Sequence, residues 1–319
     1  MVSKIPSELQ NPEFQIPRLG FSVVYNSQTK RLNYFGGMDP IKKEFHNDLW
    51  ELDQDGWKKI PINGNLPAER AFMGMVFDRR TNNLLLHGGL GSLGNIFGDT
   101  WTFDGVNWEI IDSSLSAYPR LGFSLTNNLK NETVVLFGGA TPQGRYNIAL
   151  NDTWIWDGID WVQQFPATSP PPRSSGNMVF SPIENCVILI GGESERGGYD
   201  DAWLWNGTSW LERSSLSLKH VALESRAIIF DTNKNSLLLV GKKAVDQDID
   251  AWILDGEKWR DKLLNINSHS NHGFTYNQLI YHPDWQTSIL FSTLQERKIG
   301  ENNTVLEGVN IWSEVVIID

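Results

Sequence analysis

Several features are scarce in this sequence, and each scarcity narrows the class of protein. The 319 residues include one cysteine, Cys186, which excludes an intramolecular disulfide and a zinc site built from several cysteines. No apolar run approaches the roughly 20 residues that span a bilayer. The first residues show no apolar stretch typical of a secretion signal. We therefore expect a cytoplasmic protein without a membrane segment.

Positive charge is also scarce, because 27 Lys and Arg stand against 38 Asp and Glu, a net charge of −11. An acidic surface repels phosphate backbones and anionic lipid headgroups, so we expect neither nucleic acid nor membrane as a partner. Short motifs of serine hydrolases, phosphate-binding loops and zinc proteases are absent. The sequence predicts no metal site and identifies no cofactor.

Tryptophan and glycine are abundant, with 14 and 28 copies, and they recur with a period of about 50 residues. The tripeptide Asp-x-Trp begins at Asp48, Asp99, Asp152, Asp201 and Asp250. A further tryptophan follows each copy, and an apolar run ending in Gly-Gly precedes four of them. An arginine lies still further upstream, at Arg18, Arg70, Arg120, Arg173 and Arg226. Four features in one order at one period indicate a repeated structural unit.

This set of features resembles the kelch repeat, and the resemblance implies a β-propeller. Each repeat also contains four short segments rich in β-branched and aromatic residues, separated by turn residues. In the second repeat these segments are 71–77, 84–87, 99–103 and 108–111. We therefore predict an all-β, six-bladed kelch-type propeller with four antiparallel strands per blade, forming a single domain over residues 1–319.

The sixth repeat is degenerate, with Asn310-Ile311-Trp312 in place of Asp-x-Trp. Little chain follows it to make a fourth strand. We expect residues of about 13–16 to supply that strand in the last blade and to close the ring, which would leave no free sheet edge at the closure.

The antiparallel order places two kinds of connection on one face of a propeller: those between the second and third strands of a blade, and those between blades. Several of these connections are long and varied, and loops on a rigid scaffold often carry function. The kelch resemblance implies that this face often binds partners or substrates. We expect the five repeated arginines to surround the mouth of a central channel there, where guanidinium groups suit carboxylate, phosphate or sulfate. The alternative is that each arginine pairs with a repeated aspartate inside the fold or caps strand carbonyls.

Two functions follow from this reading. The first is a monomeric binding propeller whose partner is a protein, a peptide or an anionic small molecule at the channel mouth. The second is a small-molecule isomerase, lyase or cyclase, with or without a metal, acting at the same mouth. The sequence leaves open whether the protein is an enzyme. The predicted contact residues are Arg18, Arg70, Arg120, Arg173, Arg226, His272, Tyr146, Tyr199 and His46.

Overall fold

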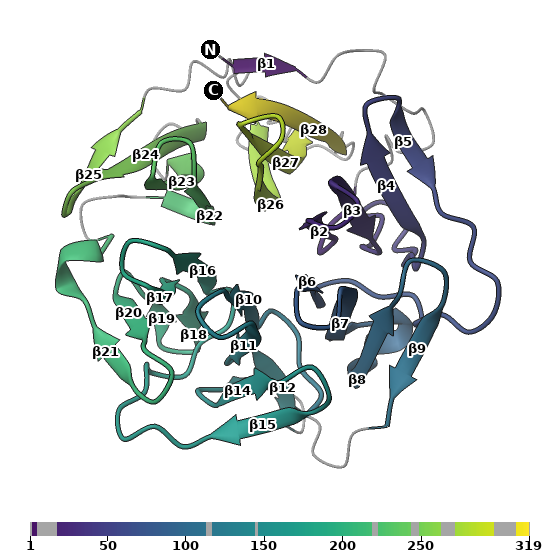
Figure 1. The fold of residues 1–319 in the computed structure, drawn as a ribbon, viewed down its shortest axis with the longest axis horizontal. Helices are drawn as coiled ribbons and strands as arrows, with labels where there is room; N and C mark the ends of the chain where they lie inside the picture. The colour runs from purple at the N-terminus through teal and green to yellow at the C-terminus, as the bar shows by residue number, and fades with distance from the viewer. Residues whose placement is uncertain are drawn as a thin grey trace, which may run out of the picture.

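The computed structural model describes residues 2–4, 18–112, 117–143, 146–218, 223–243, 249–262, 272–296 and 311–318. Its strands form six four-stranded antiparallel sheets and two short hairpins. Figure 1 shows the sheets arranged around a central axis, with the first strand of each nearest the axis. The chain is therefore an all-β propeller, as predicted.

The first three sheets follow one another along the chain. The first contains β2 (Ser22–Asn26), β3 (Arg31–Phe35), β4 (Leu49–Asp53) and β5 (Gly56–Lys59). The second contains β6 (Gly74–Asp78), β7 (Asn83–Leu90), β8 (Ile96–Phe103) and β9 (Trp108–Ile111), with the 3-10 turn η3 (Ser92–Gly94). The third contains β10 (Ser124–Asn128), β11 (Thr133–Phe137), β14 (Thr153–Trp156) and β15 (Trp161–Gln164).

The next two sheets repeat this order. The fourth contains β16 (Asn177–Ser181), β17 (Cys186–Ile190), β20 (Ala202–Trp205) and β21 (Trp210–Glu212), followed by the 3-10 turn η4 (Ser214–Leu216). The fifth contains β22 (Leu223–Asp231), β23 (Ser236–Lys243), β24 (Ile249–Asp255) and β25 (Lys258–Asp261). The two hairpins are β12 (Ala140–Gln143) with β13 (Tyr146–Ala149), and β18 (Glu193–Ser194) with β19 (Gly197–Gly198). Each hairpin lies between the second and third strands of its sheet.

The last sheet joins the two ends of the chain. Its order is β26 (His272–His282), β27 (Thr287–Glu296), β28 (Ile311–Ile318) and β1 (Val2–Lys4). Val2 lies opposite Ile318, so the strand beside β28 is residues 2–4. This corrects the choice of segment: the expected residues 13–16 lie outside the described chain, and the outer position is occupied by β1. β1 has only three residues, which is too short a pattern to be recognised from sequence without its partner strand.

The hydrophobic core lies between the sheets. Six clusters of buried side chains each combine residues of two neighbouring sheets. One of them joins the last sheet to the first through Phe291, Phe21 and Trp57. Tryptophans also bond between sheets: the indole N–H of Trp161 donates to Thr100 at 3.0 Å. The regularly spaced tryptophans thus hold adjacent sheets together.

Two sets of connections meet on one face. The segment before each inner strand pairs with the start of the connection after the second strand, as at Leu19 with Met38 and Ala71 with Leu90. We call this side the loop face; among its described parts are residues 38–47, 90–98, 117–123, 140–143, 146–151, 171–176 and 193–200. The opposite side carries the short turns and is called the turn face. Within the described segments, no helix has the length and apolar character to cross a membrane.

Candidate functional site

Four of the five repeated arginines lie inside the fold rather than around a channel. Arg18, Arg70, Arg120 and Arg173 are at most 4% exposed. Arg120 makes two parallel hydrogen bonds to Asp152, at 2.9 and 2.7 Å, and also donates to the carbonyl oxygens of Gly138 and Tyr118. Arg18, Arg70 and Arg173 bind Asp48, Asp99 and Asp201 in the same way.

These contacts occupy the N–H donors of the guanidinium group that an anion would need. The aspartate is held in turn by the next tryptophan, as Trp154 donates to Asp152 at 2.6 Å. Burial acts to raise the pKa of Asp152, but the hydrogen bonds and charge of Arg120 bring that pKa below its usual value. The expectation of an arginine-lined channel was therefore wrong for Arg18, Arg70, Arg120 and Arg173, and the pairing alternative is correct for them.

Arg226 differs from the other repeated arginines. It lies where β22 shifts its register against β23, between Glu224 and Ala227. Its guanidinium crosses to the fourth sheet, where it contacts Asp200 at 3.0 Å and the carbonyl oxygen of Tyr199 at 3.1 Å. Arg226 lines the central channel. The irregular strand thus brings one arginine to the channel mouth.

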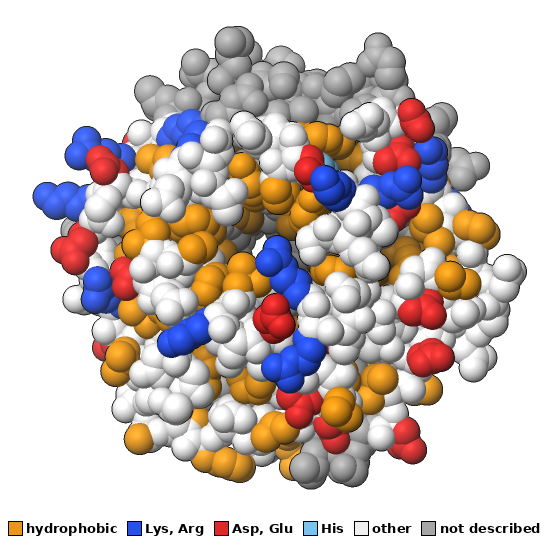
Figure 2. Space-filling view, viewed as in Figure 1, with side chains coloured by type: hydrophobic (Ala, Val, Ile, Leu, Met, Phe, Trp, Pro, Cys, Tyr) orange, Lys and Arg blue, Asp and Glu red, His pale blue; other side chains and the backbone are white. Residues whose placement is uncertain are grey.

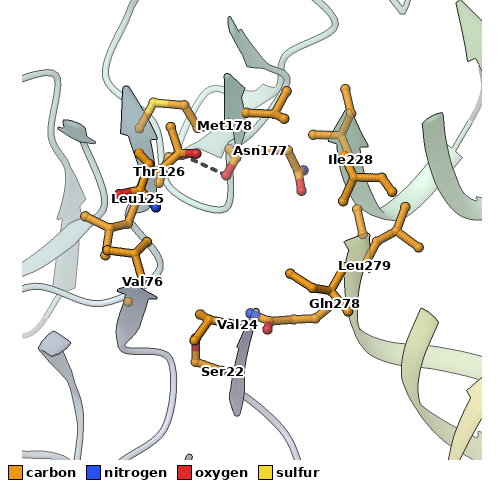
Figure 3. A pocket seen from close by; sticks show the side chains of 18 of the residues that line it. Ser22, Val24, Val76, Leu125, Thr126, Asn177, Met178, Ile228, Gln278 and Leu279 are labelled. Carbon is orange, nitrogen blue, oxygen red and sulfur yellow. Dashed lines mark hydrogen bonds between the residues drawn. The ribbon is translucent and has the colours of Figure 1, made fainter. Parts of the chain in front are cut away.

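The channel is a cavity of about 1010 Å³ between the inner strands. Figure 2 shows a hollow at the centre of the molecule, and Figure 3 shows the side chains that surround it. The wall is mixed, with Val24, Val76 and Ile228 beside the polar Thr126 and Asn177. The charged lining residues in the described chain are Arg79, Glu193 and Arg226. The wall between the inner strands is therefore largely neutral.

An arc of backbone contacts links the first four sheets at the loop-face mouth of the channel. The N–H of Phe72 donates to Gly20 at 2.7 Å, the N–H of Gly122 to Phe72 at 3.2 Å, and the N–H of Ser175 to Gly122 at 2.7 Å. All four residues have positive φ, between 56° and 65°. For Phe72 this left-handed conformation is strained. Sequence reasoning missed Phe72, although it stands two residues after Arg70, where the first and third repeats have glycine.

The remaining predicted residues are dispersed. Tyr199 lines the channel, lies with its ring 4.3 Å from the Arg173 guanidinium carbon, and is within 3.1 Å of the Ser194 hydroxyl. His46 is half-buried in the first long connection, where burial, with the charge of Arg18, lowers its pKa. Tyr146 is 78% exposed on β13. His272 opens β26, opposite Glu296. The structure therefore brings Arg226 and Tyr199 together at the channel mouth and leaves Tyr146 apart.

Three exposed apolar or aromatic side chains lie on loop-face segments of the second and third sheets. Leu93 is 99% exposed, Tyr118 66% and Tyr146 78%. The Thr141 hydroxyl donates to the Pro119 carbonyl at 2.7 Å, which ties the hairpin of Tyr146 to the segment of Tyr118. Leu93 has a φ of 62°, in the short turn η3. We call Leu93, Tyr118 and Tyr146 the exposed triad; sequence reasoning had identified only Tyr146.

Comparison with known proteins identifies several that are similar in sequence to this chain. No family model matches the chain. It is 28% identical over 181 residues to host cell factor of Drosophila melanogaster, covering 50% of this chain and 12% of that protein. It is 32% identical over 127 residues to an F-box/kelch-repeat protein of Arabidopsis thaliana, covering 34% of this chain and 26% of the relative.

A third relative is the alpha chain of the flagellar outer-arm dynein of Chlamydomonas reinhardtii, 28% identical over 188 residues, which are 54% of this chain and 4% of that one. The chain therefore matches about a quarter or less of the length of each of these relatives. The periodic Gly-Gly and Asp-x-Trp motifs, the radial sheets and these similarities together show a β-propeller that is similar to kelch-repeat proteins.

Proposed function

We propose that this chain is a protein-binding propeller that presents its loop face to a partner. The observation that carries the proposal is the exposed triad, because three large apolar or aromatic side chains lie in water on one face of two adjacent sheets. Aromatic side chains contribute strongly to binding when a partner removes them from water. The relatives with kelch repeats support the same function.

The scaffold beneath the triad is suited to this role. The buried pairs Arg70–Asp99 and Arg120–Asp152 lie at the base of the loops that carry Leu93, Tyr118 and Tyr146. Loops held in this way lose less conformational entropy when they bind a partner. Tyr199 and Arg226 at the channel mouth would extend the contact toward the axis.

We further propose that the six sheets form one closed, six-bladed ring and a single domain, acting as a monomer in the cytoplasm. The cluster shared by the last and first sheets supports closure. So does the Thr293 hydroxyl, which donates to the carbonyl oxygen of Arg18. In three other junctions a glycine N–H makes this bond, as Gly89 does to Arg120.

The two small-molecule hypotheses, an anion ligand and an enzyme substrate, receive less support. An anion held by a ring of arginines is excluded by the pairing of four of them with aspartates. Nothing in the arrangement of the described side chains favours an isomerase, lyase or cyclase over a binding protein.

The test compares two triple variants. The first, Leu93→Ser with Tyr118→Ser and Tyr146→Ser, removes the exposed triad. The control changes Val106, Ile159 and Ile183 to serine. These three residues lie in turns of the turn face and are 67%, 79% and 60% exposed. Cross-linked proteins would be purified with the wild-type chain, and the affinity of each purified candidate would then be measured by calorimetry.

We expect the first variant to bind the partner at least about tenfold more weakly, since hot-spot residues contribute 2 kcal/mol or more each. The control should bind as the wild type does. Equal affinity of all three proteins would place the interface elsewhere, and the absence of any direct binder would refute the proposed function.

A further inference from the structure

The turn between the first two strands of a sheet is built in the same way in five of the six sheets. The residue that ends the inner strand uses a side-chain oxygen to accept a backbone N–H two or three residues later. These residues are Asn26, Asp78, Asn128, Ser181 and Asp231. An oxygen of Asn, Asp or Ser fixes such a turn by mimicking a backbone acceptor.

In the last sheet a histidine takes this place. Nδ1 of His282 accepts the backbone N–H of Trp285 at 3.3 Å. A ring nitrogen that accepts a hydrogen bond carries no proton, so His282 is neutral here with its proton on Nε2. Among the six turns, this cap alone is built on an imidazole, whose acceptor nitrogen is lost when the ring takes up a proton.

The histidine lies at the contact between the last and first sheets. It is 1% exposed and stacks on Trp285, with ring centroids 4.0 Å apart and planes 8° apart. Its other ring neighbour is Tyr25 of β2, at 4.9 Å edge-on. The Tyr25 hydroxyl donates to Asp284 at 2.5 Å, and Lys30 lies 3.4 Å from the same carboxylate. The turn therefore joins β26 to the first sheet.

Of the ionisable groups at this contact, His282 is the one whose charge we expect to change in weak acid. The Tyr25 hydrogen bond, followed by Lys30, lowers the pKa of Asp284, which stays ionised in weak acid. Burial and Asp284 raise the pKa of Tyr25 to about 12, against a smaller opposing effect of Arg79. Burial lowers the pKa of His282, while Asp284 and the backbone of Lys30 act in the opposite direction. Asp231, of the fifth sheet, reaches the base of the turn through Ser288 at 3.5 Å.

We propose that the turn capped by His282 is an acid-sensitive contact between the last and first sheets. Protonation of Nδ1 replaces an acceptor with a donor that faces the Trp285 N–H, so the turn loses its cap and a buried ring gains a charge. Both effects favour an opened turn. Acid should therefore loosen this junction while the turns capped by oxygen stay closed.

The experiment is amide hydrogen exchange followed by mass spectrometry at pH 7 and pH 4.5, with rates corrected for intrinsic exchange. In the wild-type chain, we expect protection over residues 284–287 to fall at least tenfold on acidification. Residues 128–133, in the turn capped by Asn128, are the internal reference and should change less than twofold. The matched variant is His282→Asn, which restores the residue type of the first and third sheets and should abolish the acid-dependent loss.

A second measurement reads the tautomer in the wild-type protein itself. The ¹⁵N shifts of His282 at pH 7, assigned by difference from H282N, should show a bare Nδ1 and a protonated Nε2. The opposite tautomer would overturn the proposal. So would unchanged wild-type protection at pH 4.5, or an equal loss in H282N.

Discussion

At the scale of single residues, the arginines show how one repeated residue type can serve two purposes. Four of them neutralise a half-buried aspartate and hold backbone carbonyls, whereas Arg226 turns to the channel because its strand is irregular. The period of the sequence identified all five arginines. It could not give their direction, because the partner aspartates lie about 30 positions away and only the folded sheet brings them together.

Replacing Arg120 by alanine should be strongly destabilising. The change would leave the carboxylate of Asp152 largely buried without its cation, and breaking such a pair costs about 3–5 kcal/mol. Urea denaturation at pH 7 measures the free energy of unfolding. The control is Arg196→Ala, whose side chain is 86% exposed and 4.0 Å from Glu195, and which should cost less than about 0.5 kcal/mol. A loss of similar size in both variants would contradict the structural role of the buried pair.

At the scale of strands and turns, the sequence predicted which segments form strands better than it predicted where each strand ends. In the second sheet, the predicted segment 108–111 coincides with β9, whereas β7 and β8 extend beyond the predicted 84–87 and 99–103 into the long connection. Alternation and turn residues predict where a strand lies. The extension arises from pairing between Gly89 and Phe97, which depends on how a loop folds back.

The arc of backbone contacts at the channel mouth allows a test on matched glycines. Gly20 and Gly122 have nearly the same φ, 65° and 59°, but different surroundings. A Cβ on Gly20 would lie 2.6 Å from the backbone nitrogen of Phe72, while one on Gly122 would meet nothing closer than 3.8 Å. Gly122→Ala should therefore cost only the left-handed strain of about 1–2 kcal/mol.

Gly20→Ala should cost at least about 1 kcal/mol more than Gly122→Ala, because overpacking adds to the same strain. The two free energies of unfolding can be compared in urea. Equal costs would mean that Phe72 moves away freely and that the arc of backbone contacts is not tightly packed.

At the scale of the whole molecule, the proposed closure rests on side chains that meet across the ends of the chain. Phe291 of the last sheet packs edge-on against Phe21 and Trp57 of the first, with centroids 6.5 and 6.1 Å apart. The sequence predicted that the N-terminal region would be needed there. It did not identify residues 2–4, since three residues carry too weak a pattern to be recognised without their partner strand.

Replacing Phe291 by alanine should destabilise the entire protein by about 3–5 kcal/mol, because a buried aromatic is lost and a cavity remains. In a closed ring the transition should stay single, so fluorescence and circular dichroism should give coincident midpoints, lower than those of the wild type. Separate transitions for the first and last sheets, already present in the wild-type chain, would argue against closure.

The pairing of β1 with β28 also has a mechanical consequence. Because Val2 lies opposite Ile318, both ends of the chain leave this strand pair on the same side. Tension applied between the two ends would load the backbone hydrogen bonds one after another, as in opening a zipper, instead of all together in shear. Under a pulling force this propeller should therefore yield first at the outer edge of its last sheet.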